Sequence, residues 1–142
     1  MQQNNFLNNA FLHHLSIQCA DPKSLSSFYS ETLGMQSKQI HHQEKIKWLC
    51  FGNDRRIIFS PGKKKNLDFA AFSLKDENSL MNFKNILINN KVSISEYETP
   101  FFMKGSFGVK DPDNNLIIFG ISEINKGIAL SSTYSDNIYA PL

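Results

Sequence analysis

The sequence predicts an α+β fold in which two tandem βαβββ units form one curved mixed sheet, a cup with both helices on its outer face. A strand–turn–helix pattern at 13–35 recurs at 66–90 with a constant offset (76 − 21 = 55 residues). Short alternating segments bounded by turn residues follow each copy. The length of 142 residues suits a single domain with a substantial core. The repeated positions are Asp21, Ser24, Leu25 and Phe28, which recur as Asp76, Ser79, Leu80 and Phe83.

The first unit, taken as 12–62, opens with alternating residues that predict a strand. Asp21 is a good N-cap for the helix that follows, Pro22 suits its first position, and Gly34 suits its end. The two faces of the first strand carry Leu15, Ile17 and Cys19 on one side and His14, Ser16 and Gln18 on the other. Further strands are expected at 35–43, 46–51 and 55–60, with a turn at 52–54.

The second unit, taken as 66–122, repeats this order. Asp76 or Asn78 is expected to cap its helix, and a strong turn signal at 111–115 joins the two strands of a closing hairpin. The first strand, Leu67–Leu74, carries Ala70, Phe72 and Leu74 on one face and Phe69, Ala71 and Ser73 on the other. The remaining strands are expected at 92–97, 107–110 and 116–121, and the tail 123–142 is expected to pack on the surface.

Composition and short motifs exclude several classes of function. The net charge of +2 is too small to predict a nucleic-acid partner, and no apolar run is long enough to span a membrane. The first eleven residues lack the basic and apolar regions of a signal peptide. Cys19 and Cys50 have no metal-site spacing, and we expect free thiols in a reducing compartment, which predicts a cytoplasmic protein. The sequence has no phosphate-binding loop or nucleophile elbow, and no cofactor is expected.

Three motifs in order carry a resemblance to a known family. They are His14-Leu15-Ser16-Ile17, then Asp21-Pro22 through Leu33-Gly34, and later Asp111-Pro112-Asp113 running into Leu116-Ile117-Ile118. Over 12–122 the chain resembles the vicinal oxygen chelate superfamily, which includes glyoxalase I, bleomycin-resistance proteins and extradiol dioxygenases. The run 66–72 makes it most similar to the N-terminal module of two-module extradiol dioxygenases. The resemblance implies a module that carries the fold without a metal site.

Catalytic members of this superfamily hold a divalent metal ion on side chains from several strands of the cup. Carried over residue by residue, the resemblance assigns the three main ligand positions to His14, Phe69 and Ile118, and an optional fourth to Phe59. Only His14 has a donor atom suited to a metal ion, so we predict no metal site. Residues available for a relocated site are His13, His41, His42, Glu44, Glu96 and Glu98, but exposed polar strand positions are the simpler interpretation.

Strand alternation predicts an apolar cup with a few polar groups, the composition of a pocket for a small aromatic or amphipathic ligand. Trp48 is the preferred stacking residue. The predicted ligand-binding residues are His14, Ser16, Gln18, Trp48, Ile57, Phe59, Phe69 and Ile118, and Cys50, Ala71, Ser73 and Leu116 are expected to share their face. A second interpretation stays open, in which Phe59, Phe69 and Ile118 fill the cup as core residues.

Four functions remain open at this point. The first is a metal-independent binding protein for a small hydrophobic or aromatic ligand. The others are a metal-dependent enzyme as the resemblance suggests, a cofactor-free enzyme with His14 as acid or base, and a non-catalytic structural module. The apolar segment Phe101-Phe102-Met103 is expected to form a flap over the cup or part of a contact in a homodimer.

Overall fold

The computed structural model describes residues 10–52, 54–63 and 66–122, which form one mixed eight-stranded sheet with helices packed against it. Residues 1–9 and the tail 123–142, which was expected to pack on the surface, lie outside these residues. The strand order is β2-β3-β4-β1-β5-β8-β7-β6. The elements are β1 (Ala10–Cys19), α1 (Pro22–Ser27), the π-helical turn η2 (Phe28–Thr32), β2 (Gln36–His42), β3 (Lys45–Gly52), β4 (Arg55–Pro61), β5 (Asn66–Leu74), α2 (Glu77–Asn89), β6 (Ser95–Glu96), β7 (Phe107–Lys110) and β8 (Leu116–Gly120).

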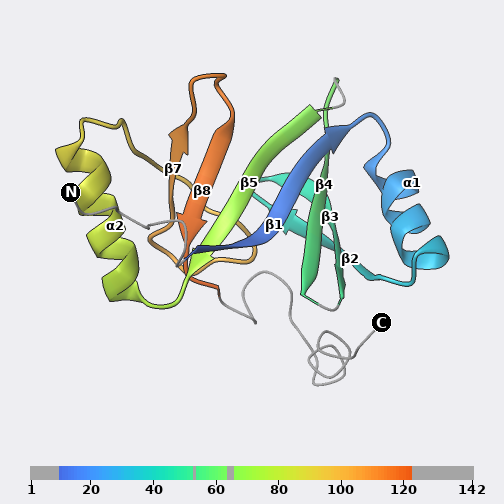
Figure 1. Ribbon diagram of the computed structural model, residues 1–142. Helices are drawn as coiled ribbons and strands as arrows, with labels where there is room; N and C mark the ends of the chain where they lie inside the picture. The colour runs from blue at the N-terminus through green and yellow to red at the C-terminus, as the bar shows by residue number, and fades with distance from the viewer. Residues whose placement is uncertain (1–9, 53, 64–65, 123–142) are drawn as a thin grey trace.

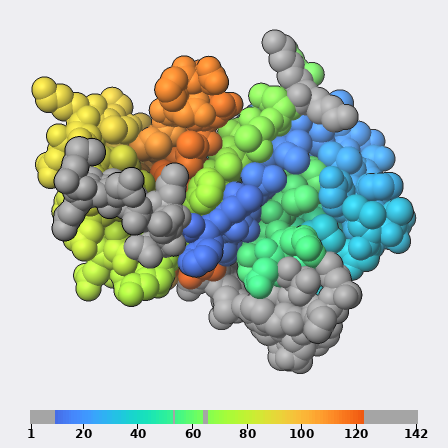
Figure 2. All heavy atoms as spheres, viewed as in Figure 1, coloured from blue at the N-terminus to red at the C-terminus, as the bar shows by residue number. Residues whose placement is uncertain are grey.

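The two units meet along one antiparallel pair, β1 with β5, at the centre of the sheet. In the first unit β1 runs parallel to β4, and in the second unit β5 runs parallel to β8. The strand order is therefore mirrored about the central pair, which confirms the predicted pair of βαβββ units. Figure 1 shows α1 and α2 at opposite ends of the sheet, and Figure 2 shows β1 and β5 side by side between them.

Both helices begin as the sequence predicts. Asp21 Oδ1 accepts a hydrogen bond from the Ser24 amide at 3.1 Å, and Asp76 Oδ1 accepts one from the Ser79 amide at 2.8 Å. Each cap satisfies a backbone donor that a helix start leaves without a partner. The predicted end at Gly34 is also confirmed, since its φ of 80° favours glycine. No helix within the described residues is long and apolar enough to cross a membrane.

The outer face of the sheet holds two apolar clusters, one under each helix. Under α2, Phe83 packs with Phe107 and Phe119. Under α1, Leu25 and Tyr29 pack on β1, β3 and β4 through Cys19, Ile17, Trp48, Cys50, Ile57 and Phe59. The last four residues were predicted to line the cup, and this prediction is wrong.

The error arises because both faces of β3 and β4 are covered. The outer face is covered by α1, and the inner face is covered by apolar side chains that lie inside the cup. The two strands therefore contain continuous apolar runs, 48–51 and 57–59. Because polar and apolar residues do not alternate in these runs, the sequence does not show which side chains face the cup. The neighbouring residues face the cup instead. Leu49 and Ile58 belong to the buried apolar cluster on the inner face of the sheet, and Lys47 and Ser60 line a cavity beside that cluster.

The segment 92–103 also differs from its prediction. Only Ser95–Glu96 forms a strand, because the chain then turns inward. Phe101 and Phe102 are fully buried against the inner face of the sheet, so the segment is neither a flap nor an exposed contact surface. We call these two residues the plug.

The plug approaches the backbone of β8 at Gly120, and this contact gives a testable prediction. A Cβ atom at Gly120 would overlap the ring of Phe102 and lie 2.9 Å from Ser106 Cβ. Gly120→Ala is therefore expected to lower the free energy of unfolding by about 1–3 kcal/mol in urea denaturation, since overpacking forces neighbours to shift. The matched control is Gly52→Ala, whose Cβ would meet no atom within 4 Å. Equal effects of the two substitutions would contradict the close approach.

Candidate functional site

The inner face of the sheet is divided into a filled part and an open part. In the filled part, the rings of Phe101 and Phe102 both lie 4.9 Å from the ring of His14, measured between centroids. Phe69 closes another side of His14 at 5.7 Å. The side chain of His14 is consequently 1% exposed. The plug therefore occupies the part of the cup next to the first strand's histidine.

A β-bulge explains why two consecutive histidines are both buried in this part. Leu12 pairs with Phe72 and His14 pairs with Ala71, so His13 is an extra residue in β1. His13 Nδ1 lies 2.8 Å from His14 Nδ1, so that one ring donates and the other accepts. His13 Nε2 also lies 2.9 Å from Ser122 Oγ. The bulge thereby joins the two rings in one hydrogen-bonded pair.

Both histidines are held in the neutral form. Burial lowers the pKa of His13 to about 3, and the charge of Arg56 adds to this shift. Burial also lowers the pKa of His14 well below its ordinary value, with smaller effects from His13 and Arg56. His14 Nε2 is buried without a hydrogen-bond partner in the described part of the chain. The pair thus consists of two neutral imidazole rings packed against phenylalanine side chains.

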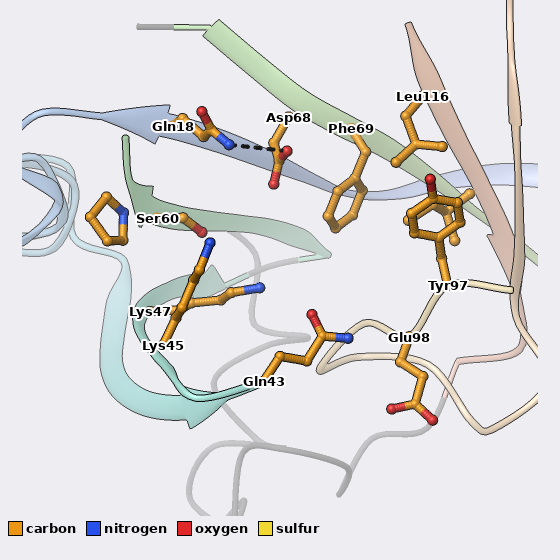
Figure 3. A pocket seen from close by; sticks show the side chains of 12 residues that line it. Gln18, Gln43, Lys45, Lys47, Ser60, Asp68, Phe69, Tyr97, Glu98 and Leu116 are labelled. Atoms are coloured by element: carbon orange, nitrogen blue, oxygen red, sulfur yellow. Dashed lines mark hydrogen bonds between the residues drawn. The ribbon is translucent and has the colours of Figure 1, made fainter. Parts of the chain in front are cut away.

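The open part of the cup is a cavity of about 240 Å³ between β1, β3, β4, β5 and β8. Figure 3 shows its two sides, with the lysines on one side and Tyr97, Glu98 and Leu116 on the other. The polar lining residues are Gln18, Gln43, Lys45, Lys47, Ser60, Asp68 and Glu98, and the remaining ones are Pro61, Phe69, Tyr97, Leu116 and Ile118. Seven of the twelve lining residues are polar or charged, so the open part of the cup is more polar than strand alternation predicts.

Lys47 is the most unusual residue of the cavity because its side chain is only 8% exposed. Its Nζ lies 3.4 Å from His42 Nδ1, to which the ammonium group donates. Burial lowers the pKa of Lys47, and the neighbouring charge of Lys45 acts in the same direction, whereas Asp68 opposes them. Lys47 therefore places its terminal nitrogen, as an ammonium group or as a neutral amine, where few water molecules can reach it.

Asp68 enters the cavity through a second β-bulge. Ile17 pairs with Leu67 and Ser16 pairs with Phe69, so Asp68 is an extra residue in β5. Its carboxylate accepts from Ser16 Oγ at 3.3 Å and from Gln18 Nε2 at 3.4 Å. These bonds fix the carboxylate on the cavity wall next to the apolar ring of Phe69.

Ser60 supplies a polar atom that the protein itself does not satisfy. Its side chain is buried, and its hydroxyl oxygen has no hydrogen-bond partner among the described residues. A buried hydroxyl without a partner costs free energy, which a bound polar group would recover. Ser60 and Lys47 thus lie at one end of the cavity, and the side chains of Leu116 and Tyr97 lie at the other end together with the carboxylate of Glu98.

The residues present do not fit the metal ion that the superfamily resemblance implies. Of the three main ligand positions, His14 is buried against three phenylalanine rings, and Phe69 and Ile118 offer no donor atom. The optional position, assigned to Phe59, lies on the outer face under α1. Within the described residues, no group of three or more His, Cys, Asp or Glu side chains is placed to hold a metal ion.

The structure distributes the eight predicted ligand-binding residues over three places. Gln18, Phe69 and Ile118 line the cavity. His14 and Ser16 are buried on the inner face but do not line it. Trp48, Ile57 and Phe59 lie on the outer face.

Sequence reasoning missed Lys45, Lys47, Ser60, Asp68 and Tyr97 as lining residues. One available signal was a charged residue inside an otherwise apolar strand, as Lys47 is between Ile46 and Trp48. The same signal was present at Asp68, between Leu67 and Phe69. Such a residue is rarely buried without a partner or a function.

The fold is shared with known dioxygenases. No family model and no curated protein matches the sequence. Among solved structures, the 2,3-dioxygenase LapB from Pseudomonas sp. KL28 is similar with a TM-score of 0.67 and 15% identity, over 83% of this chain and 46% of that one. BphC, a halotolerant catechol dioxygenase, gives 0.64 and 18%, over 80% and 39%. A catechol 2,3-dioxygenase gives 0.64 and 12%, over 80% and 40%.

These similarities concern the fold alone, since the identities are low. They support the vicinal oxygen chelate fold that the sequence motifs predict. The chain spans less than half the length of the dioxygenases that it matches. The homodimer and the cytoplasmic location stay predictions.

Proposed function

We propose that this chain binds a small amphipathic molecule, without a metal ion, in the cavity of the cup. The observation that carries the proposal is the pair Lys47 and Ser60, two buried polar groups that face apolar walls across one cavity. The ligand class is a one-ring molecule with a polar substituent. This class agrees with the aromatic or amphipathic ligand predicted from the sequence.

The orientation of the ligand follows from the two ends of the cavity. A ring is expected to contact Phe69, Leu116 and Ile118, where contact with apolar side chains removes it from water. Its polar substituent is expected to accept from Lys47 and Ser60. The Asp68 carboxylate already accepts hydrogen bonds from Ser16 and Gln18. An acceptor group of the ligand is therefore expected to bind to the lysine and not to lie against this carboxylate.

Benzoate is the probe for this proposal, because it combines one ring with one acceptor group. In titrations followed by NMR chemical shifts, benzoate is expected to perturb amides of β3, β4 and β5 around the cavity. Lys47→Met is expected to weaken its binding about tenfold or more, since a charge-assisted hydrogen bond is lost. Tryptophan fluorescence is a poor readout here because Trp48 lies on the outer face.

The matched control is Lys110→Met, which removes the charge of an exposed lysine at the end of β7. This variant is expected to bind benzoate as the unsubstituted chain does. Perturbations that are absent, that lie outside the cavity, or that Lys47→Met leaves unchanged would overturn the proposal.

A second candidate function is a non-catalytic module, and the plug is the observation that favours it. Phe101 and Phe102 fill the part of the cup around His14 with the chain's own side chains. The resemblance to the N-terminal module of two-module dioxygenases supports the same candidate. The cofactor-free enzyme with His14 has less support, because the ring of His14 is packed against three phenylalanine rings and His14 lines a separate cavity of about 230 Å³ rather than the one that contains Lys47. Benzoate binding at Lys47 would separate the binding protein from the purely structural module.

A further inference from the structure

We propose that Lys47 is a carbonyl-reactive amine, which captures an aldehyde or ketone in the cavity as an imine. This inference rests on the proposed function, because it assigns a substrate class to the same cavity. It goes beyond that function by adding a covalent step at a named atom, Lys47 Nζ.

Geometry is the first support for this assignment. The side chain of Lys47 is 8% exposed and lines the cavity with Ser60 and Phe69. The one ion pair within the described residues joins Arg56 to Asp54 at 3.6 Å. Lys47 therefore forms no salt bridge with a carboxylate of the described residues. A cavity-facing amine without a salt bridge has room to approach a carbonyl carbon. Figure 3 shows Lys45 and Lys47 extending together into this space.

Electrostatics is the second support. An amine attacks a carbonyl only in its neutral form, and desolvation or a second cation favours that form. Burial lowers the pKa of Lys47 and is the largest effect; the charge of Asp68 opposes this shift, and the smaller effect of Lys45 adds to it. The group next to Nζ is His42, whose Nδ1 at 3.4 Å is placed to take a proton from the ammonium.

The chemical step is balanced without any further reactant. The lone pair of Lys47 Nζ forms a bond to the carbonyl carbon, the π electrons of the C=O bond move to the oxygen, and one of the two N–H protons passes to that oxygen to give a carbinolamine. Loss of the second N–H proton and of the hydroxyl group, as water, leaves the C=N bond of the imine. The products are therefore one imine and one water molecule, with no change of oxidation state. Ser60 Oγ lines the same cavity without a hydrogen-bond partner among the described residues, so it is available to donate to the carbonyl oxygen.

The test uses benzaldehyde as the probe and cyanoborohydride to trap the imine, followed by peptide mapping in a mass spectrometer. We expect Lys47 to acquire the benzyl adduct at least tenfold faster than the exposed Lys110 in the unsubstituted chain. Added benzoate is expected to slow this reaction at Lys47 and not at Lys110. In Lys47→Arg the fast adduct is expected to disappear, and in Lys110→Arg, which replaces the exposed lysine of β7, it is expected to remain.

Two outcomes would overturn the inference. One is an equal rate at Lys47 and Lys110, which is measured in the unsubstituted chain and does not depend on any variant folding. The other is a fast adduct at a different lysine. Benzoate does not form an imine, so its titration separates the two proposals. Benzoate binding without a fast Lys47 adduct would overturn this inference alone, and loss of both would also overturn the proposed function.

Discussion

Phe102→Ala is expected to lower the free energy of unfolding by about 3–5 kcal/mol. The ring of Phe102 is fully buried and contacts both buried histidines, at 5.1 Å from His13 and 4.9 Å from His14 between ring centroids. Removing it would leave a cavity lined by aromatic rings and by the backbone of Gly120. Urea denaturation at neutral pH measures the loss.

The matched control for this substitution is Phe11→Ala. Phe11 is 68% exposed at the start of β1, so its loss is expected to change stability by about 0.5 kcal/mol or less. A cost for Phe102→Ala within about 1 kcal/mol of that control would show that the plug is not part of the core.

Acid is expected to destabilise the protein through His13 and His14. Burial lowers the pKa of His13 from 6.5 to about 3, so the folded protein stays neutral at this site while the unfolded chain takes up a proton. The unfolded state binds more protons between these two pH values, and stability therefore falls as the pH falls below about 6.5. At pH 5 the loss from His13 is about 2 kcal/mol, and His14 adds to it in the same direction.

Urea denaturation at pH 7.5 and pH 5 measures this effect. His13→Gln is expected to reduce the difference between the two pH values, because it removes one of the two titrating groups and keeps a polar side chain at the bulge. The control is His41→Gln, which removes an exposed histidine of β2. If the unsubstituted chain were equally stable at both pH values, the two buried rings would not be held neutral.

The arrangement of the fold was predictable because its signals are local and occur twice. The two N-caps, the glycine that ends the first helix and the Asp111 turn each satisfy backbone groups within a few residues. The faces of β5 were also predictable, since Phe69 and Ala71 pack inward while Phe72 and Leu74 pack under α2. Each of these features depends on a short stretch of sequence, and the repeat shows that the second stretch behaves as the first.

The candidate site was less predictable because it depends on long-range register. The runs 48–51 in β3 and 57–59 in β4 are apolar on both faces, so nothing within them shows which side meets α1. Asp68 enters the cavity only through a bulge, which alternation within β5 does not reveal. The plug was placed wrongly for a related reason, since an apolar loop is equally suited to a flap and to a core.

The two bulges of the central pair have a consequence for how this sheet responds to length changes. One extra residue stands in β5 at Asp68 and one in β1 at His13, so the ladder is offset by one step between them and returns to its original phase beyond them. They act as a matched pair of insertions. Deleting either residue alone would shift one end of the pair out of phase and turn its side chains to the wrong face, whereas deleting both would restore an unbroken ladder. The position of the His13–His14 pair and that of the Asp68 carboxylate therefore both depend on the register of β1 with β5, although these side chains do not contact each other.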